Sequence, residues 1–191
     1  MVYLVASCET HHQVVSAGED GMRRHVKPDF EDEKVVQSLY QLYQGSFKGS
    51  SIPPNPDSNL RMPANAAVKC KILAFLLKSA KAANTFPSMI QVIFDALYGE
   101  GTNPKLRSLG MNFVTWVAKM CESAIIKPIA PVLVSGLLKL IEQKDDQAQL
   151  APEAEALRGF AYEAVGLVSK RGIVDLQILN IVRSFSLQRH T

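Results

Sequence analysis

Cys8, His11 and His12 form the densest group of metal-binding side-chain types in this sequence. A structural zinc site needs four such ligands, and two histidines on a helix chelate best when they lie four residues apart. Adjacent helical residues point about 100° apart, so His11 and His12 cannot act as such a pair. No second cysteine lies near Cys8 to complete the set. We therefore expect neither a metal site nor a cofactor.

Two glycine-containing segments, 45–51 and 99–101, invite comparison with phosphate-binding loops. Neither has the Gly-x-x-x-x-Gly-Lys-Ser/Thr spacing, and neither follows an expected strand, so both are interpreted as turns. The acidic runs 31–33 and 145–146 are typical of a helix start and a solvated loop, because carboxylates stabilise helix N-termini. The sequence contains no nucleophile elbow or other catalytic constellation. It predicts a protein that is not an enzyme.

Lys69, Arg107 and Arg158 are the one polar pattern that recurs. Each follows an aliphatic residue, and the segment after Arg107 aligns with that after Arg158 at a shift of 51 residues and with that after Lys69 at a shift of 38. These shifts bracket the roughly 40–47 residues of HEAT-type repeats. The three bases either form an intramolecular ladder between neighbouring repeats or a row that faces a partner. The ladder is the simpler interpretation, because stacked repeats need such contacts for registry.

The elements that would position these residues are helices. Apolar residues recur at helical spacing from Ala64 onward, with Thr85 as the expected N-cap of a helix that ends at Gly99, and Asn103 as the cap before Pro104. The predicted inward faces include Met120 and Val132, and a small residue such as Gly110 is expected to let the preceding helix pack closely. The expected helices are 10–26, 31–43, 64–79, 85–98, 104–120, 128–141, 152–171 and 173–187.

This pattern predicts an all-α fold, a HEAT/armadillo-like helical-repeat solenoid, with an irregular helical bundle as the alternative. Three parts are expected along the chain: first helical pairs over 1–44, a loop rich in Pro and Ser over 45–63, and one continuous stack of repeats over 64–191. A helical pair cannot bury its apolar face alone, so neighbouring pairs complete the core.

Composition narrows the class of partner. A net charge of +3 over 191 residues is too small for a dedicated nucleic-acid binder or an electrostatic membrane anchor. Three scattered cysteines are typical of a reducing compartment, and the N-terminus lacks the basic front of a signal peptide. The uncharged run 128–138 is too short to span a bilayer. We expect a soluble, intracellular protein that does not insert into membranes.

Several ordered strings resemble one family: 68–72, 82–87, 90–99, 102–109, 126–133 and 163–171. They are similar to the N-terminal region of the large proteasome-associated HEAT-repeat scaffolds of the extracellular-mutant (Ecm) family. The stretches 4–15 and 36–45 fit more loosely, so the resemblance covers nearly the whole chain. It implies an adaptor that binds regulatory or core particle subunits of the proteasome, helps to assemble or stabilise the holoenzyme, and links it to protein quality control in cytoplasm and nucleus.

Members of that family carry many more repeats, so we expect this chain to be a fragment. Two other functions stay open: a spacer whose repeats only set the curvature of a larger scaffold, and a trafficking scaffold of the karyopherin type. A binding surface would carry a contiguous exposed patch that repeat stacking does not explain. A spacer would be charged and mixed on all sides.

Overall fold

The computed structural model describes residues 2–25, 29–44, 64–99, 102–142 and 152–169, together with Asn180. These residues form helices and the turns between them, and no strand occurs among them. The elements are α1 (Val2–Ala6), α2 (His12–His25), α3 (Glu33–Tyr43), α4 (Ala66–Leu76), α5 (Ala80–Thr85), η1 (Phe86–Met89), α6 (Ile90–Tyr98), α7 (Pro104–Met120), α8 (Ser123–Ile126), η2 (Lys127–Ile129), α9 (Ala130–Glu142) and α10 (Pro152–Val168).

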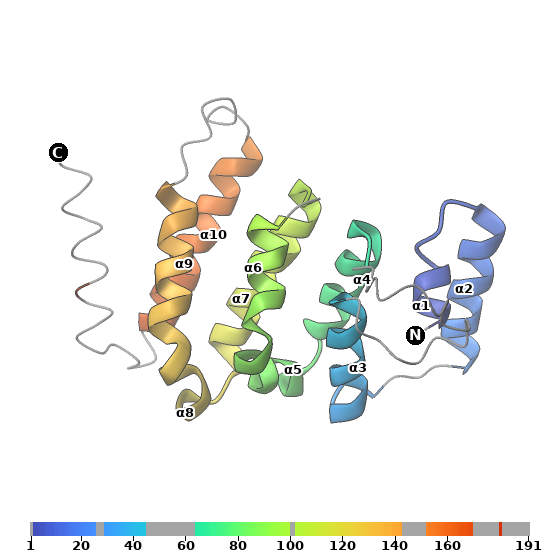
Figure 1. Cartoon of the computed structure of the whole chain (residues 1–191), viewed down its shortest axis with the longest axis horizontal. Coiled ribbons are helices and arrows are strands. Elements are labelled where there is room, and N and C mark those ends of the chain that lie inside the picture. The colour runs from blue at the N-terminus through green and yellow to red at the C-terminus, as the bar shows by residue number, and fades with distance from the viewer. Residues whose placement is uncertain are drawn as a thin grey trace, which may run out of the picture.

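The helices pair and the pairs stack. Helix α1 packs on α2, α3 on α4, α6 on α7 and α9 on α10, and Figure 1 shows these pairs following one another along the long axis. Helix α7 lies at the centre, because it contacts α4 and α5 on one side and α10 on the other. This arrangement confirms the predicted all-α helical-repeat class. The finer assignment to HEAT repeats stays a prediction.

Side-chain caps fix where several helices begin. Asp32, Asn65 and Asn103 each accept a backbone amide at the start of α3, α4 and α7, and Pro104 occupies the first position of α7 as expected. The prediction that Thr85 caps the next helix was wrong. Ser79 takes that role for α5, because its backbone is extended there and its hydroxyl accepts the Ala82 amide, whereas Thr85 is helical.

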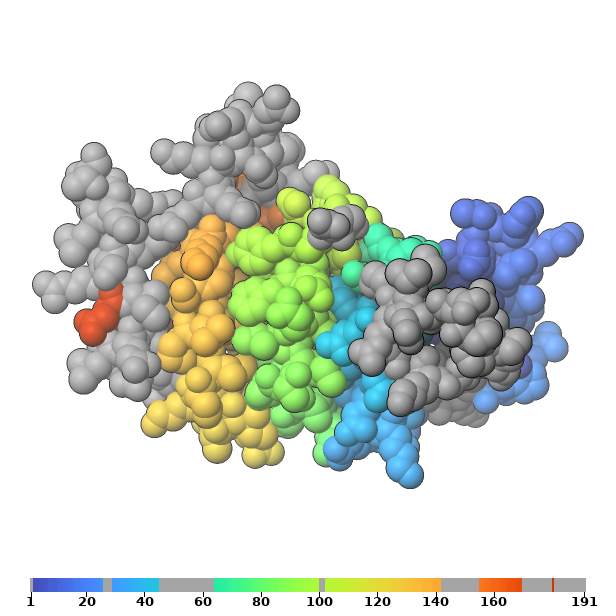
Figure 2. Space-filling view, in the orientation of Figure 1, coloured from blue at the N-terminus to red at the C-terminus, as the bar shows by residue number. Residues whose placement is uncertain are grey.

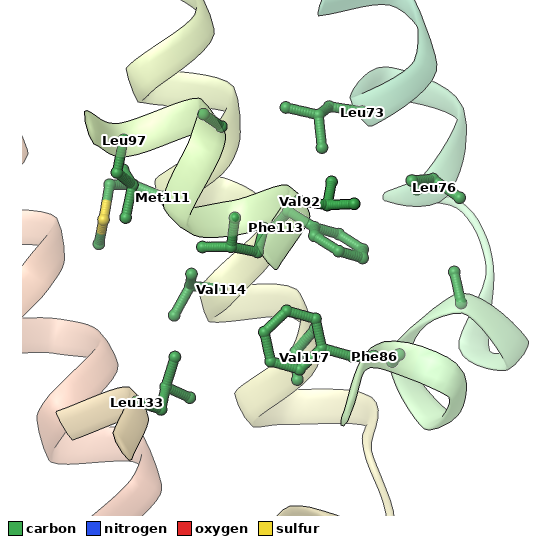
Figure 3. Close-up of a cluster of buried hydrophobic side chains, with 14 of the residues drawn as sticks. Leu73, Leu76, Phe86, Val92, Leu97, Met111, Phe113, Val114, Val117 and Leu133 are labelled. Atoms are coloured by element: carbon green, nitrogen blue, oxygen red, sulfur yellow. The ribbon is translucent and has the colours of Figure 1, made fainter. Parts of the chain in front are cut away.

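The core runs through all the central pairs. Phe86 and Phe113 meet edge to face with ring centroids 6.0 Å apart, and Figure 3 shows them among aliphatic side chains of α4, α6, α7 and α9. Gly110 lies on α7 where an added Cβ would come within 3.0 Å of the Ala96 Cβ of α6. The close approach expected of Gly110 is therefore confirmed.

Two side chains predicted to face inward do not. Met120 is 41% exposed at the end of α7, and Val132 is 55% exposed on α9. On α9 the inward positions Leu133 and Leu137 are buried as predicted, together with Val134. Val132 lies about 100° around the helix from Leu133, at the edge of that face. The structure begins α9 at Ala130, after the short helices α8 and η2, and not at Pro128 as expected.

The first helix, α1, was not expected, and the glycines of α2 explain how it docks. Gly18 and Gly21 lower the helix propensity of α2, yet both are buried against α1. A Cβ at Gly18 would lie 2.5 Å from the Ser7 backbone nitrogen, and one at Gly21 would overlap the Tyr3 ring. Their missing side chains let the two backbones approach closely.

By length and composition, the stretch Ser123–Ile141 could cross a membrane, with a mean hydropathy of 1.8. It is longer than the uncharged run considered in the sequence because Lys127 and Lys139 lie within it. Its apolar side chains Ile126, Leu133 and Leu137 are buried in the helical stack, as is usual for a core helix of this composition. Such a stretch alone is weak support for a membrane span, and the expectation of no insertion stays a prediction.

The remaining expectations fall on residues outside the described ranges. They are the loop 45–63, the turn at 100–101, the acidic run 145–146 and the final helix 173–187. Figure 2 shows the described helices as successive bands of colour along the molecule, from α1 and α2 at one end to α9 at the other.

Candidate interaction surface

The three repeated basic residues lie in the helices of one layer. Lys69 belongs to α4, Arg107 to α7 and Arg158 to α10, and α7 packs against both of its counterparts. The caps confirm the register between the first two. The Asn65 side chain accepts the Val68 amide at 2.9 Å, and the Asn103 side chain accepts the Leu106 amide at 2.8 Å. Each base is therefore the residue after the capped amide.

Their immediate partners differ. The Lys69 ammonium lies 5.1 Å from the centroid of the Tyr43 ring, and the Arg107 Nε donates a 3.2 Å hydrogen bond to the Thr102 hydroxyl. Arg158 is half-buried on α10. In the described part of the chain none of the three is ion-paired to a carboxylate. The helix dipole does not account for bases near an N-terminus either, because it favours anions there. Whether they form a ladder or face a partner stays a prediction.

A second surface, which the sequence did not indicate, lies between α6 and α9. It is an open groove of about 850 Å³. Two aromatic rings, apolar residues, a serine and a lysine line it. Its lining residues are Phe94 and Tyr98 from α6, and Pro131, Val132, Ser135, Gly136 and Lys139 from α9. Figure 2 shows this side of the molecule, with α6 in green beside α9 in orange.

Gly136 is the residue that lets this groove form. A Cβ at this position would overlap the Phe94 ring, so only glycine allows the ring to lie against the α9 backbone. Tyr98 then donates a 2.7 Å hydrogen bond from its hydroxyl to the Gly136 carbonyl oxygen. Phe94 and Tyr98 stack with centroids 6.3 Å apart. Burial raises the pKa of Tyr98 to about 12, so the phenol stays a neutral donor at physiological pH.

The groove was missed because it depends on two helices that are distant in sequence. Val132 was expected inward, and its exposure adds an aliphatic side chain to the lining of the groove. The available signal was Gly136, a glycine inside an otherwise apolar helix, which often marks a close approach of another group.

The acidic run 31–33 has a structural role. The Glu31 carboxylate accepts the amides of Ala80 and Lys81 at 2.8 and 3.0 Å, so it caps α5 from a distant part of the chain. Glu33 forms a 3.0 Å ion pair with the Lys81 ammonium. These contacts join the start of α3 to α5. The interpretation of this run as a charged helix start is confirmed by Asp32, whose side chain caps α3, and by Glu33 in its first turn.

The described residues were compared with the arrangements that metal binding and thiol chemistry need. No cluster of three or more His, Cys, Asp or Glu side chains suited to a metal occurs in the described residues. Burial raises the pKa of the Cys70 thiol, partly opposed by the charge of Lys105, so this cysteine is not an activated nucleophile. The stacked helix pairs define a helical-repeat protein. Its notable surface features are the groove and the three basic residues.

Comparison with known proteins identifies the family of this helical-repeat chain. The family described as "Proteasome component ECM29, N-terminal" matches residues 1–183. The match covers nearly the whole chain, so the chain belongs to the ECM29 N-terminal family. This agrees with the resemblance found in the strings of the sequence.

Curated relatives support the same assignment. The human "Proteasome adapter and scaffold protein ECM29" is 35% identical over 175 residues, which cover 88% of this chain and 9% of the human protein. The Schizosaccharomyces pombe "Proteasome component ecm29" is 25% identical over 172 residues, or 89% of this chain and 9% of that protein. The Drosophila melanogaster "Proteasome-associated protein ECM29 homolog" is 26% identical over 145 residues, or 75% of this chain and 7% of that protein.

The chain therefore spans about a tenth of the length of the curated relatives that it matches. No solved structure gives a significant match.

Proposed function

We propose that this chain is a segment of a proteasome-associated scaffold and that it contributes a docking surface for the proteasome. The observation that carries the proposal is the family match over residues 1–183, together with relatives that are named as proteasome adapters, components or associated proteins. A stack of helix pairs suits this role, because it presents an extended surface without needing a catalytic centre. The names of the relatives also favour a proteasome scaffold over a trafficking scaffold.

In its finer form, the proposal is that the segment contacts regulatory or core particle subunits, helps to stabilise or assemble the holoenzyme, and acts in the cytoplasm and nucleus in protein quality control. The exposed groove between α6 and α9 supports a binding role, because repeat stacking alone does not require an exposed aromatic and aliphatic surface.

The test is direct binding to purified particles. The chain is mixed separately with 26S holoenzyme, 20S core and 19S regulatory particle, and each mixture is resolved on a native gel. Co-migration with one particle that is competed by excess untagged chain would support the docking role and would identify the particle. If the folded chain co-migrates with none of the three, the docking role is refuted.

The second candidate function is a spacer. It is favoured by the small share of the relatives that this chain covers, because proteasome contacts could all lie in the other nine tenths. A graft distinguishes the two functions. If the full-length relative keeps its affinity for the proteasome after this segment is replaced by helix pairs of equal number and unrelated surface, the segment is a spacer.

A further inference from the structure

We propose that the α1–α2 hairpin opens and closes as one unit against α4, and that Lys71 holds it closed. The hairpin consists of residues 2–25, and Figure 1 shows it at one end of the stack. Its docking is through α1, which packs on α4. The proposal concerns a movement within the chain, so it goes beyond the proposed docking of the proteasome and does not depend on it.

The hairpin is one body because its two helices touch through their backbones. A Cβ at Gly18 of α2 would meet the backbone nitrogen of Ser7, and the Tyr3 ring fills the space beside Gly21. Tyr3 also stacks on His25, the last residue of α2, with ring centroids 6.0 Å apart. These contacts extend from the middle of α2 to its end, so α1 moves together with α2.

The hairpin contributes little apolar surface to the core. Leu4 is the one buried side chain of α1, and the buried residues of α2 are Gly18 and Gly21, which have no side chain. Val2 is 67% exposed and Val14 is 42% exposed, although both are apolar. A segment with few buried apolar contacts has a low free energy of local opening. Polar contacts therefore carry a large part of the docking of this hairpin.

One side chain of α4 makes polar contacts with both parts of the hairpin. The Lys71 Nζ donates a 2.6 Å hydrogen bond to the Ser7 Oγ and lies 3.8 Å from the Glu19 Oε1 of α2. Ser7 is buried, and its hydroxyl donates in turn to the Leu4 carbonyl oxygen at 2.7 Å. A hydrogen bond from an ammonium group to a buried acceptor stabilises more than an exposed ion pair does. The bond to Ser7 is therefore the main contact that holds the hairpin, and the pair with Glu19 is the minor one.

The Cys70 thiol lies next to the hairpin and reports on its opening. Cys70 is buried on α4, and Cys8, which follows α1, is close enough for its charge to act on the Cys70 thiol. Burial raises the pKa of Cys70, Lys105 of α7 opposes this rise, and Cys8 adds to it. Opening removes Cys8 and part of the burial, whereas Lys105 stays, because α7 packs on α4. In the open state the thiol is more accessible and its pKa is lower, so it reacts faster.

The test measures opening in two ways on the full 191-residue chain. Hydrogen exchange, resolved by mass spectrometry, follows the amides of residues 2–25 and those of α7. Alkylation by N-ethylmaleimide, quantified for each cysteine by peptide mass spectrometry, follows the thiols of Cys70 and Cys121. Cys121 is fully buried at the end of α7 and is the internal control for unfolding of the whole chain.

Lys71→Met keeps the apolar stem of the side chain and removes the ammonium group. Exchange over residues 2–25 and alkylation of Cys70 should both become about tenfold faster, because a hydrogen bond from a charged group is lost. Exchange in α7 and alkylation of Cys121 should not change. Lys71→Arg keeps the charge and the donors, so it should retain most of the protection.

Two further variants make the result specific to the Ser7 contact. Glu19→Gln removes only the exposed ion pair and should raise both rates by less than about threefold. Lys81→Met is the matched control, because it removes a partly exposed lysine that pairs with Glu33 at 3.0 Å and makes no contact with the hairpin. It should change neither rate. Thermal melts of all variants verify that the fold is retained.

Four results would overturn the proposal. Unchanged exchange over residues 2–25 in Lys71→Met would show that this lysine does not hold the hairpin. Faster exchange confined to residues 2–7 would show that α1 opens without α2. An equal response of α7 and Cys121 would show that the whole chain unfolds and that the hairpin is not a separate unit. An equal response to Lys81→Met would show that the effect is not specific to Lys71.

Discussion

Replacing Trp116 tests how α7 is joined to the helices before it. The indole is half-buried, and its Nε1 donates a 2.9 Å hydrogen bond to the Ser79 carbonyl oxygen. Ser79 is fully buried between α4 and α5, and its hydroxyl accepts the Ala82 amide at the start of α5. The side chain thus holds the junction of two helices against a third.

The magnitude follows from what each substitution removes. Trp116→Phe keeps an aromatic ring but loses the N–H donor. Ser79 is fully buried, so its carbonyl oxygen loses the Trp116 donor at a place that water does not reach. The expected loss is that of a buried hydrogen bond, about 1–2 kcal/mol of unfolding free energy. Trp116→Ala also removes the ring, and partial exposure puts its cost near 3 kcal/mol, the low end for a large aromatic.

Urea denaturation followed by far-UV circular dichroism measures both losses. Tryptophan fluorescence cannot serve, because Trp116 is the one tryptophan of the chain. Met120→Ala, which truncates an exposed side chain at the end of the same helix, is the control and should change stability by less than about 0.5 kcal/mol. If the unfolding free energy of Trp116→Phe equals that of wild type within error, the hydrogen bond does not contribute to stability. If the unfolding free energy of Trp116→Ala also equals that of wild type, the indole is not part of the core.

Three further outcomes are expected. Glu31→Ala should lower the unfolding free energy by about 1 kcal/mol in urea titrations, because it uncaps α5, whereas Glu33→Ala removes an exposed ion pair and should cost less than half of that. Gly18→Ala should undock α1, seen as faster amide exchange over 2–7 with α7 unaffected; unchanged exchange would contradict the close packing. Burial raises the pKa of Tyr98 to about 12, so the folded state holds its proton above the unfolded value near 10. Stability present below pH 10 should fall by at most about 1.4 kcal/mol per pH unit as the pH rises toward 12, and Tyr98→Phe should remove that part of the slope.

The sequence was a good guide wherever the signal was local. Asn103 and Pro104 predicted the start of α7, and Gly99 predicted the end of α6, because caps and helix breakers act on neighbouring residues. The match of Lys69 with Arg107 was also recoverable, since the two caps recur at a fixed spacing. Ser79 shows the limit of this reasoning. It and Thr85 are both good caps by type, and the choice depends on the bend that packing imposes after α4.

Features that depend on a distant partner could not be predicted. Gly18 and Gly21 have a local cost in a helix, and their benefit appears only when α1 lies against them. Val132 fits an inward apolar face by periodicity, but it lies at the edge of the face that α9 buries, and its exposure depends on which neighbouring helix covers that edge. The groove combines both difficulties, because its lining comes from two helices distant in sequence and includes Val132, which was assigned to the buried face.

Two glycines fix the place of α6 within the stack, and they do so differently. Gly110 brings α7 close to α6 within one helix pair, where the nearest atom to an added Cβ is the Ala96 methyl at 3.0 Å. Gly136 brings α9 close to α6 across the boundary between pairs, where the nearest group is the Phe94 ring. A larger side chain at Gly110 would therefore clash with Ala96 inside one helix pair. A larger side chain at Gly136 would clash with the Phe94 ring, which lines the groove. The Phe94 ring that lines the groove thus rests on the same contact that brings α9 close to α6.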